Sequence, residues 1–142
     1  MDSTIAALLP LARDARENGR HYNGFKVGCL GYGPNGEIFL GANFKPTQDA
    51  EPLCSEEQVM LQAAEAGVIL RGLIVVGQPR VEDTTRTLHC CGERCRPAMR
   101  RRMRLGAVVE PETRIVCVNS ITGAIEEFTV LSLHEAHGET LD

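Results

Sequence analysis

Apolar residues at helical spacing predict two helices in the first half of the chain. In residues 9–18 the apolar positions fall on one side of a helix, where Pro10 suits the first turn and Gly19 suits a C-terminal stop. A second apolar stripe begins after Cys54 and ends at Gly67, again a residue that favours a helix end. One helix is therefore expected before the first strand and another directly after Cys54.

Short apolar runs predict five strands. They comprise residues 25–32, 37–42, 73–76, 115–118 and 125–130. Asn35 and Gly36, between the first two runs, tolerate the positive φ of a tight turn, so these two strands are expected to form an antiparallel hairpin. Residues 43–53 hold two prolines and few apolar side chains, and they are expected to form a surface loop.

The second half of the chain continues the alternation of helices and strands. Residues 91–105 are predicted to be helical, and the end of the chain, with His134 and His137, is either a short helix or a tail. This order favours an α/β fold with helices packed on a sheet. A chain of 142 residues fits one domain, which we expect to span residues 1–142.

Composition and charge exclude several classes of function. The chain is 43% hydrophobic and 24% charged, as in ordinary folded proteins, and its net charge of -4 disfavours general binding to nucleic acid or anionic membrane. A local exception is a group of arginines in one predicted helix. These are Arg94, Arg96, Arg100, Arg101, Arg102 and Arg104. They form a solvated helix face, or they contact a partner subunit, a metal site or a phosphate-bearing ligand.

The ends and apolar runs of the chain predict a cytoplasmic protein. The N-terminus lacks the basic start and apolar block of a secretory signal, and the apolar run in residues 67–77 is interrupted by Arg71 and too short to cross a bilayer. In a reducing compartment the six cysteines are better explained as metal ligands, reactive thiols or core residues than as disulfides. Cys29 and Cys117 lie in strand-like apolar runs and are predicted core residues.

Two cysteine-containing segments indicate a zinc site. Cys54 precedes Glu56 by two residues, and Cys91 and Cys95 lie one helical turn apart in a later segment. Both segments begin predicted helices, where unpaired backbone amides favour thiolates. Three thiolates hold zinc and leave a fourth position for water, as in catalytic sites, and the Glu56 carboxylate is close enough to handle the protons of that water.

Each of these residues also has a simpler explanation when taken alone. Cys54 fits a small buried side chain, and Glu56 fits a surface acid beside a helix start. Cys91 and Cys95 fit a redox pair or core residues. It is their combination, three soft ligands with one acid, that points to zinc.

Four ordered motifs resemble those of the cytidine deaminase family, over most of the chain. The family's Phe-x-Val-Gly-Ala strand is matched by residues 25–29, its Gly-x-Asn by residues 41–43, its Cys-Ala-Glu by residues 54–56 and its Pro-Cys-Gly-x-Cys-Arg by residues 90–96. The resemblance implies a three-layer α/β/α cytidine deaminase-like fold with a mixed sheet of about five strands. It also implies a homotetramer whose active sites are completed by neighbouring subunits.

The resemblance further implies roles for individual residues. Cys54, Cys91 and Cys95 would bind Zn²⁺, and Glu56 would act as acid and base without binding the metal. Asn43 would hydrogen-bond a sugar hydroxyl, although a turn residue would also fit this position. Phe25 would help to form the base pocket, and core packing explains it equally well.

Several positions depart from the family pattern. Cys91 and Cys95 enclose three residues instead of two, and Cys90 replaces the usual proline, so that Cys90 is an alternative ligand and the preceding residue, His89, offers a nitrogen. Lys45 stands where an acid usually follows the asparagine. Other departures concern charge and the C-terminus. Glu57 stands where many relatives have an arginine that offsets the excess negative charge of three thiolates on a divalent ion, and Arg94 or Arg96 could supply that positive charge here. Residues 131–142 show no clear counterpart of the family's C-terminal aromatic residue.

The leading hypothesis is hydrolytic, zinc-dependent deamination of a cytosine nucleoside, cytidine, deoxycytidine or a modified analogue, to the uracil form with release of ammonia. Lys45 keeps blasticidin S-type and other specialised aminonucleosides open as substrates. Two alternatives come from other classes. The altered cysteine spacing suggests a zinc-binding protein that has kept the fold without catalysis. The arginines suggest a nucleic-acid editing or binding protein, but the negative net charge and the scarcity of aromatic residues argue against this second alternative.

Overall fold

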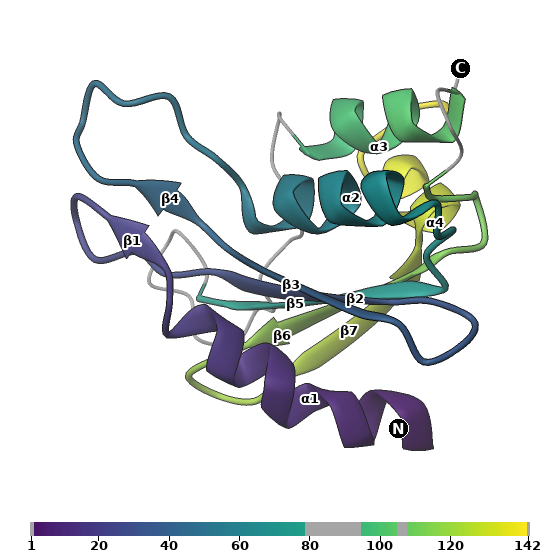
Figure 1. Ribbon diagram of the computed structural model, residues 1–142, viewed down its shortest axis with the longest axis horizontal. Helices are drawn as coiled ribbons and strands as arrows, with labels where there is room; N and C mark the ends of the chain where they lie inside the picture. Colours follow the sequence, from purple (N-terminus) through teal and green to yellow (C-terminus); the bar gives the residue numbers. More distant parts are fainter. Residues whose placement is uncertain (1, 79–94, 105–107, 142) are drawn as a thin grey trace.

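A mixed five-stranded sheet forms the centre of the computed structural model, which describes residues 2–78, 95–104 and 108–141 (Figure 1). In spatial order the strands are β3 (Ile38–Ala42), β2 (Gly28–Tyr32), β5 (Gly72–Gly77), β6 (Arg114–Asn119) and β7 (Ile125–Thr129). The β5–β6 pair is parallel and the other three pairs are antiparallel. All five strands predicted from the sequence are present, and the predicted hairpin is the β2–β3 pair, with Gly36 at φ 81° in its turn.

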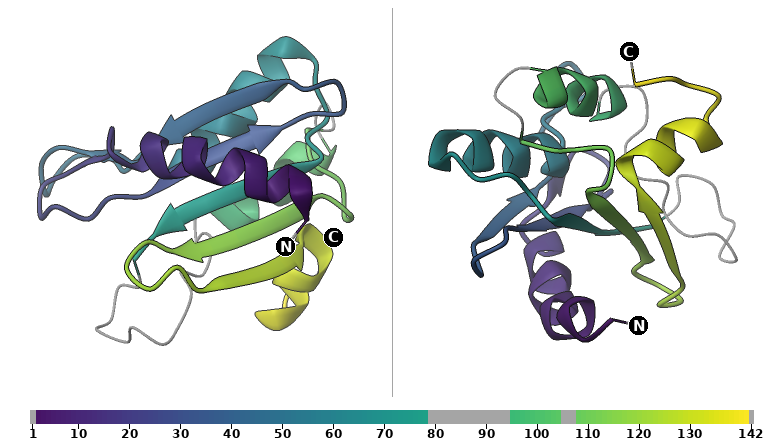
Figure 2. Two further views of the ribbon diagram at one scale, coloured as in Figure 1. Left: turned by 90° about the horizontal axis from the view of Figure 1, so that it is seen from below. Right: turned by 90° about the vertical axis from the view of Figure 1, so that its right-hand side faces the viewer.

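Helices cover both faces of this sheet (Figures 1 and 2). Helix α1 (Ser3–Arg16) lies on one face, and α2 (Ser55–Ala66), α3 (Cys95–Arg104) and α4 (Val130–Ala136) lie on the other. Alternate strand residues face the two sides, so that Cys29 and Cys117 are buried with α2, α3 and α4, while Leu30 and Val116 are buried with α1. This arrangement confirms the three-layer α/β/α fold and the core positions of Cys29 and Cys117.

The helices are short. They contain 14, 12, 10 and 7 residues, whereas crossing a bilayer takes about 20 apolar residues. Within the described parts of the chain, therefore, none of the helices has the length and apolar character of a membrane span.

Helix α1 begins earlier than its sequence predicted. The prediction placed Pro10 in the first turn of a helix over residues 9–18, but Pro10 lies inside α1. The predicted start of this helix was therefore wrong. The Asp2 carboxylate caps the helix by accepting from the Thr4 N–H at 2.7 Å, and Ile5 starts the buried stripe. Pro10 is tolerated because it lies on the exposed side, where water can bind the carbonyl group left without an amide partner.

Residues 43–53 are not simply the surface loop that was predicted. They contain β4 (Phe44–Lys45), which pairs in parallel with β1 (Arg20–His21) to form a small second sheet. Phe44 also forms an isolated antiparallel bridge with Leu53, through two hydrogen bonds of 2.9 Å. Figure 1 shows β1 and β4 projecting beyond one end of the main sheet. Two-residue strands carry no periodic pattern, so the sequence contained little to reveal them.

Helix α2 is tied to the edge strand β3 by side-chain amides. Gln58 Oε1 accepts from the Ala42 N–H at 3.2 Å and its Nε2 donates to the Ala42 carbonyl, while Gln62 Nε2 donates to the Leu40 carbonyl at 2.8 Å. These contacts satisfy backbone groups that an edge strand leaves free. Gly41 allows the approach, because a Cβ atom there would overlap the carbonyl oxygen of Ser55. The first turn of α2 is therefore fixed against β3.

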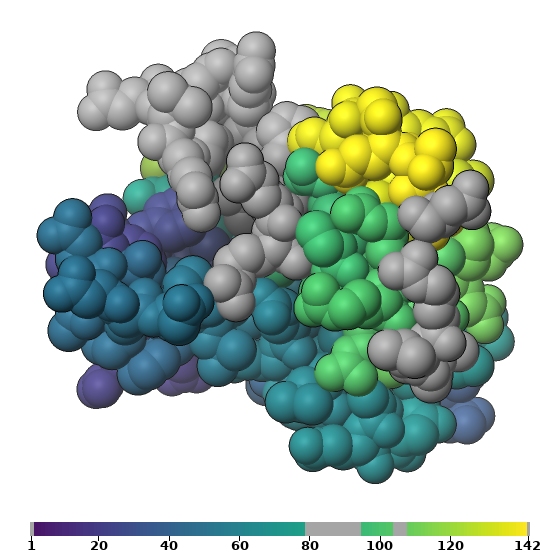
Figure 3. Space-filling view, turned by 90° about the horizontal axis from the view of Figure 1, so that it is seen from above, coloured from purple at the N-terminus to yellow at the C-terminus, as the bar shows by residue number. Residues whose placement is uncertain are grey.

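The C-terminal residues hold α3. They include α4, which starts at a capping box between Thr129 and Ser132, so the end of the chain is a short helix rather than only a tail. The buried His134 lies with Nε2 3.3 Å from the Arg96 carbonyl oxygen, and Glu139 accepts from Arg96 Nε at 2.8 Å and from an Arg100 amino group at 3.4 Å. Figure 3 shows the C-terminal segment against α3 on the face that α2 shares.

Replacing Gln58 by alanine tests how α2 is anchored. The substitution leaves both backbone groups of Ala42 without their partner in a half-buried position, and we expect the free energy of unfolding in urea to fall by about 1–3 kcal/mol. Gln62→Ala is the control, since it removes one exposed hydrogen bond and should cost less. Equal losses in the two variants would contradict the special role of Gln58.

Replacing Glu139 by glutamine tests the hold on α3. The hydrogen bond from Arg96 lowers the pKa of the Glu139 carboxyl, so its stabilising effect is complete above the unfolded pKa and disappears as the pH falls through the folded one. We expect Glu139→Gln to melt slightly below wild type at pH 7, with the difference vanishing in acid. The exposed Glu135→Gln is the control. A melting difference independent of pH would contradict the pairing.

Candidate metal centre and active site

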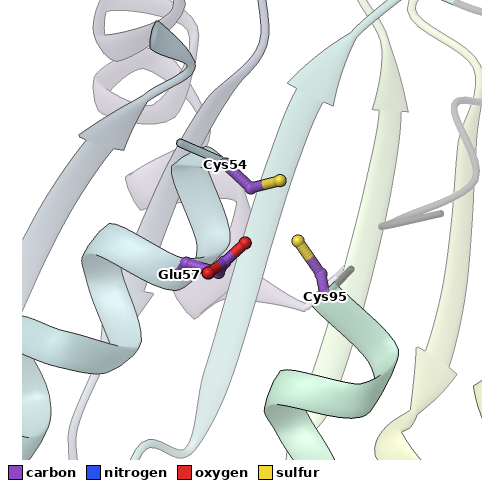
Figure 4. A group of neighbouring side chains, drawn as sticks. All are labelled: Cys54, Glu57 and Cys95. Atoms are coloured by element: carbon purple, nitrogen blue, oxygen red, sulfur yellow. The ribbon is translucent and has the colours of Figure 1, made fainter. Parts of the chain in front are cut away.

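The thiols of Cys54 and Cys95 face each other across the starts of two helices (Figure 4). Cys54 is the N-cap of α2, with extended backbone angles of φ -75° and ψ 147° and without a side-chain capping hydrogen bond. Cys95 is the first residue of α3 and is buried. Their Sγ atoms and one carboxylate oxygen of Glu57 all lie within 4.8 Å of one another. Three potential metal ligands thus meet at one point.

The anchoring contacts of the two helices explain this meeting. The Gln58 amide and the close approach at Gly41 place the first turn of α2 on β3, while His134 and Glu139 hold the first turn of α3 through Arg96. The two cysteines are far apart in sequence, and it is the tertiary packing of their helices that brings them together.

The electrostatics of the cluster call for a cation. The pKa of the Cys54 thiol is raised, first by its hydrogen bond to Cys95, then by burial, and then by the negative charges of Cys95, Glu56 and Glu57. The helix N-terminus alone would lower a thiol pKa, so here the hydrogen bond to Cys95, burial and the neighbouring charges together outweigh it. Two thiolates and a carboxylate become compatible once a divalent ion compensates their charge.

The chemistry of these donors fits zinc. Thiolate sulfur and carboxylate oxygen are both common zinc ligands, and sulfur ligands disfavour magnesium and calcium. Cys54 and Cys95, two of the three predicted metal ligands, are in position to share one ion. The third, Cys91, lies outside the described residues, as do its alternatives Cys90 and His89.

Glu56 lies beside this cluster in a protected position. It is the second residue of α2 and only 4% exposed, and it accepts a hydrogen bond from the Ser55 hydroxyl at Oε1. Its negative charge contributes to raising the pKa of the Cys54 thiol. A buried carboxylate is therefore held close enough to Cys54 for its charge to act on that thiol.

Asn43 organises the chain next to β2. Its Nδ2 donates to the Phe25 carbonyl at 2.7 Å, and its Oδ1 accepts from the Val27 N–H at 2.9 Å. These bonds use one N–H and one lone pair, so one more of each remains on the amide. Phe25 is half-buried against the main core cluster, with its ring edge-on to His21 at a centroid distance of 5.8 Å.

The structure places Lys45, which departs from the family pattern, and Arg96, one of the two arginines that could compensate the thiolate charge. The Lys45 ammonium lies 5.8 Å from the centre of the Tyr22 ring, within the range of a cation–π contact. The Arg96 guanidinium pairs with Glu139, and Arg94 lies outside the described residues.

Glu57 is the donor that sequence reasoning did not assign to the metal. It was treated as a source of unwanted charge, but its carboxylate lies with the two sulfur atoms. A usable signal was its spacing, since a residue three positions after an N-cap tends to fold back toward it.

Comparison with protein families found a match that covers most of the chain. A family model described as the cytidine and deoxycytidylate deaminase zinc-binding region matches residues 2–118, which is most of the chain. A search of curated proteins found no match.

Solved structures with the same fold support this result. The cytidine deaminase of Burkholderia pseudomallei is 26% identical, with a TM-score of 0.72 over 94% of this chain and 96% of that one. The cytidine deaminase of Mycobacterium leprae is 24% identical, with a TM-score of 0.61 over 93% of this chain and 98% of that one. That of Mycobacterium tuberculosis is 21% identical, with a TM-score of 0.64 over 94% and 95%. The last two show the shared fold alone.

The extent of the family match, the three-layer fold and the paired cysteines agree with one another. The chain therefore belongs to the cytidine and deoxycytidylate deaminase family, as a hydrolase that acts on the C–N bonds of cyclic amidines, with zinc as its cofactor.

Proposed function

We propose that this protein deaminates a cytosine nucleoside, such as cytidine, deoxycytidine or a modified analogue, to the uracil form with release of ammonia. The observation that carries the proposal is the meeting of the thiols of Cys54 and Cys95 at two helix starts, with the buried carboxylate of Glu56 two residues after Cys54 and close enough for its charge to affect that thiol. The solved cytidine deaminase that is 26% identical to this chain supports the choice of substrate class.

Cys54 and Cys95 would hold the zinc ion, with Cys91 as the proposed third thiolate and Cys90 as the alternative. When bound, zinc supplies the Lewis acidity that makes water a nucleophile near neutral pH. The support for the two described cysteines is the convergence of their sulfur atoms, and that for Cys91 is the sequence motif alone.

Glu56 would move the protons. Its carboxylate, positioned by the hydrogen bond that Oε1 accepts from the Ser55 hydroxyl, would take a proton from the attacking water and deliver it to N3 of the base. The same carboxylate would then protonate the departing amine. At 4% exposure the carboxylate is shielded from bulk water, which favours transfer to the substrate over exchange with solvent.

Asn43 and Phe25 would position the nucleoside. Asn43 has one N–H and one lone pair beyond its backbone bonds, which suit a sugar hydroxyl, and its bonds to the Phe25 carbonyl and the Val27 amide hold it rigidly. Phe25 offers an aromatic wall for the base. Lys45, near this position, replaces an acceptor by a donor and keeps blasticidin S-type nucleosides among the candidate substrates.

We also propose a homotetrameric, cytoplasmic protein with one domain over residues 1–142. The family resemblance supports the tetramer. Reduced thiols at Cys29, Cys54, Cys95 and Cys117 agree with a reducing compartment. Two apolar clusters packed on opposite faces of one sheet support the single domain.

The Glu56→Gln variant tests the proton shuttle. Glutamine keeps the size of the side chain and can still accept from Ser55, but it cannot carry the proton, so we expect zinc content to be retained while ammonia release falls by about 10²–10⁴-fold. Cys54→Ala provides the contrast, with loss of metal and of stability. Glu65→Gln, exposed on the same helix, is the control. Normal turnover by Glu56→Gln would rule out the shuttle.

One observation favours a second function, that of a zinc protein without catalysis. If the Glu57 carboxylate and three thiolates all stayed on the metal, the site would have four protein ligands and no place for water, as in structural zinc sites.

A panel of nucleosides separates the two functions. Cytidine, deoxycytidine, cytosine, their modified forms and blasticidin S would be incubated with zinc-loaded protein, and ammonia and absorbance measured. We expect at least one cytosine nucleoside to be converted, because Glu56 is held next to the metal-binding thiols. Zinc-loaded protein that releases no ammonia from any of them would support the non-catalytic function instead.

A further inference from the structure

The backbone of α2 directs Glu57 toward the sulfur atoms. With Cys54 as the N-cap, Glu57 is the third helical residue, and a glutamate at that position characteristically bends back toward the cap. Figure 4 shows its carboxylate pointing into the gap between Cys54 and Cys95. The arrangement therefore follows from local helix geometry as well as from tertiary packing.

The distances suit a shared ion. Zinc–sulfur bonds of about 2.3 Å and zinc–oxygen bonds of about 2.1 Å place two ligand atoms of a tetrahedral ion roughly 3.5–3.8 Å apart. The three donor atoms here lie within 4.8 Å of one another, so a small rotation of the side chains would complete the geometry. Glu57 needs no movement of the helix to reach the metal.

We propose that Glu57 binds the zinc ion directly in the resting protein, so that the centre contains a carboxylate oxygen in addition to thiolates. The proposal rests on the zinc site of the proposed function and adds a ligand to it. If the third thiolate proposed from the sequence motif also binds, deamination would require water to take a fifth coordination position or to replace the Glu57 carboxylate.

Glu57 also lines a surface groove. The groove has a volume of about 370 Å³, and its lining includes Arg101 and Arg102 of α3. Both arginines are cations that favour an ionised carboxylate in the same groove. Glu57 thus lies between the metal cluster and a groove with a partly basic lining.

A capping role is the simpler explanation, and it is separable by experiment. Glutamate and glutamine both serve at the third helical position of a capping box. Glu57→Gln therefore keeps the capping function and removes the anionic ligand. Glu65→Gln, in an exposed position on the same helix, is the matched control for the loss of one negative charge from α2.

The test uses cobalt(II) in place of zinc, without substrate. Wild type and Glu65→Gln should show the same d–d absorption bands, whereas Glu57→Gln should show shifted d–d bands, an unchanged sulfur-to-cobalt charge-transfer band and zinc affinity weakened by tenfold or more. The charge-transfer band verifies that the variant is folded and keeps its thiolate ligands. A Glu57→Gln spectrum that superimposes on wild type, with equal zinc affinity, would overturn the proposal.

The outcome is independent of catalysis. Since the spectra are recorded without a nucleoside, they report ligation even if the wild-type protein releases no ammonia. Failure of the proposed function would appear in the nucleoside panel, and failure of the Glu57 proposal would appear in the cobalt spectra.

Discussion

Mutual repulsion among acidic groups at one point is the constraint on which the site depends. Two helix starts bring the thiols of Cys54 and Cys95 together with the carboxylate of Glu57, and the hydrogen bond to Cys95, burial and the charges of Cys95, Glu56 and Glu57 all make ionisation of the Cys54 thiol harder. Protein interiors rarely hold such a cluster unless its charge is compensated. A divalent ion provides the compensation, so the close arrangement of these groups depends on metal binding.

Separate contacts hold the starts of α2 and α3 in place, and thereby hold the two thiols close together. On one side, Gln58 binds both backbone groups of Ala42 on the edge strand, and this strand would otherwise be free to pair with another chain. On the other, Arg96 is held by Glu139 and His134 in the C-terminal segment. Stability of the helix anchors is thereby linked to the spacing of the sulfur atoms.

The parts of the structure with strong periodic or motif signals were predictable from the sequence. These include the five strands, the hairpin at Asn35 and Gly36, the helix ending at Gly67, and the meeting of Cys54 and Cys95 at helix starts. The start of α1 was misplaced because Pro10 was given more weight than the capping Asp2. The pairing of β1 with β4 depends on contacts between distant residues, which leave no pattern along the chain. The spacing of Glu57 after the N-cap Cys54 is a local signal, but its place beside Cys95 depends on where two helices meet.

X-ray absorption at the zinc edge measures the central claim directly, because it identifies the atoms bound to the metal. The account predicts zinc in the purified protein, bound mainly by sulfur at about 2.3 Å with one oxygen neighbour at about 2.0–2.2 Å. A zinc environment made only of oxygen and nitrogen atoms would contradict the convergence of Cys54 and Cys95 on one ion.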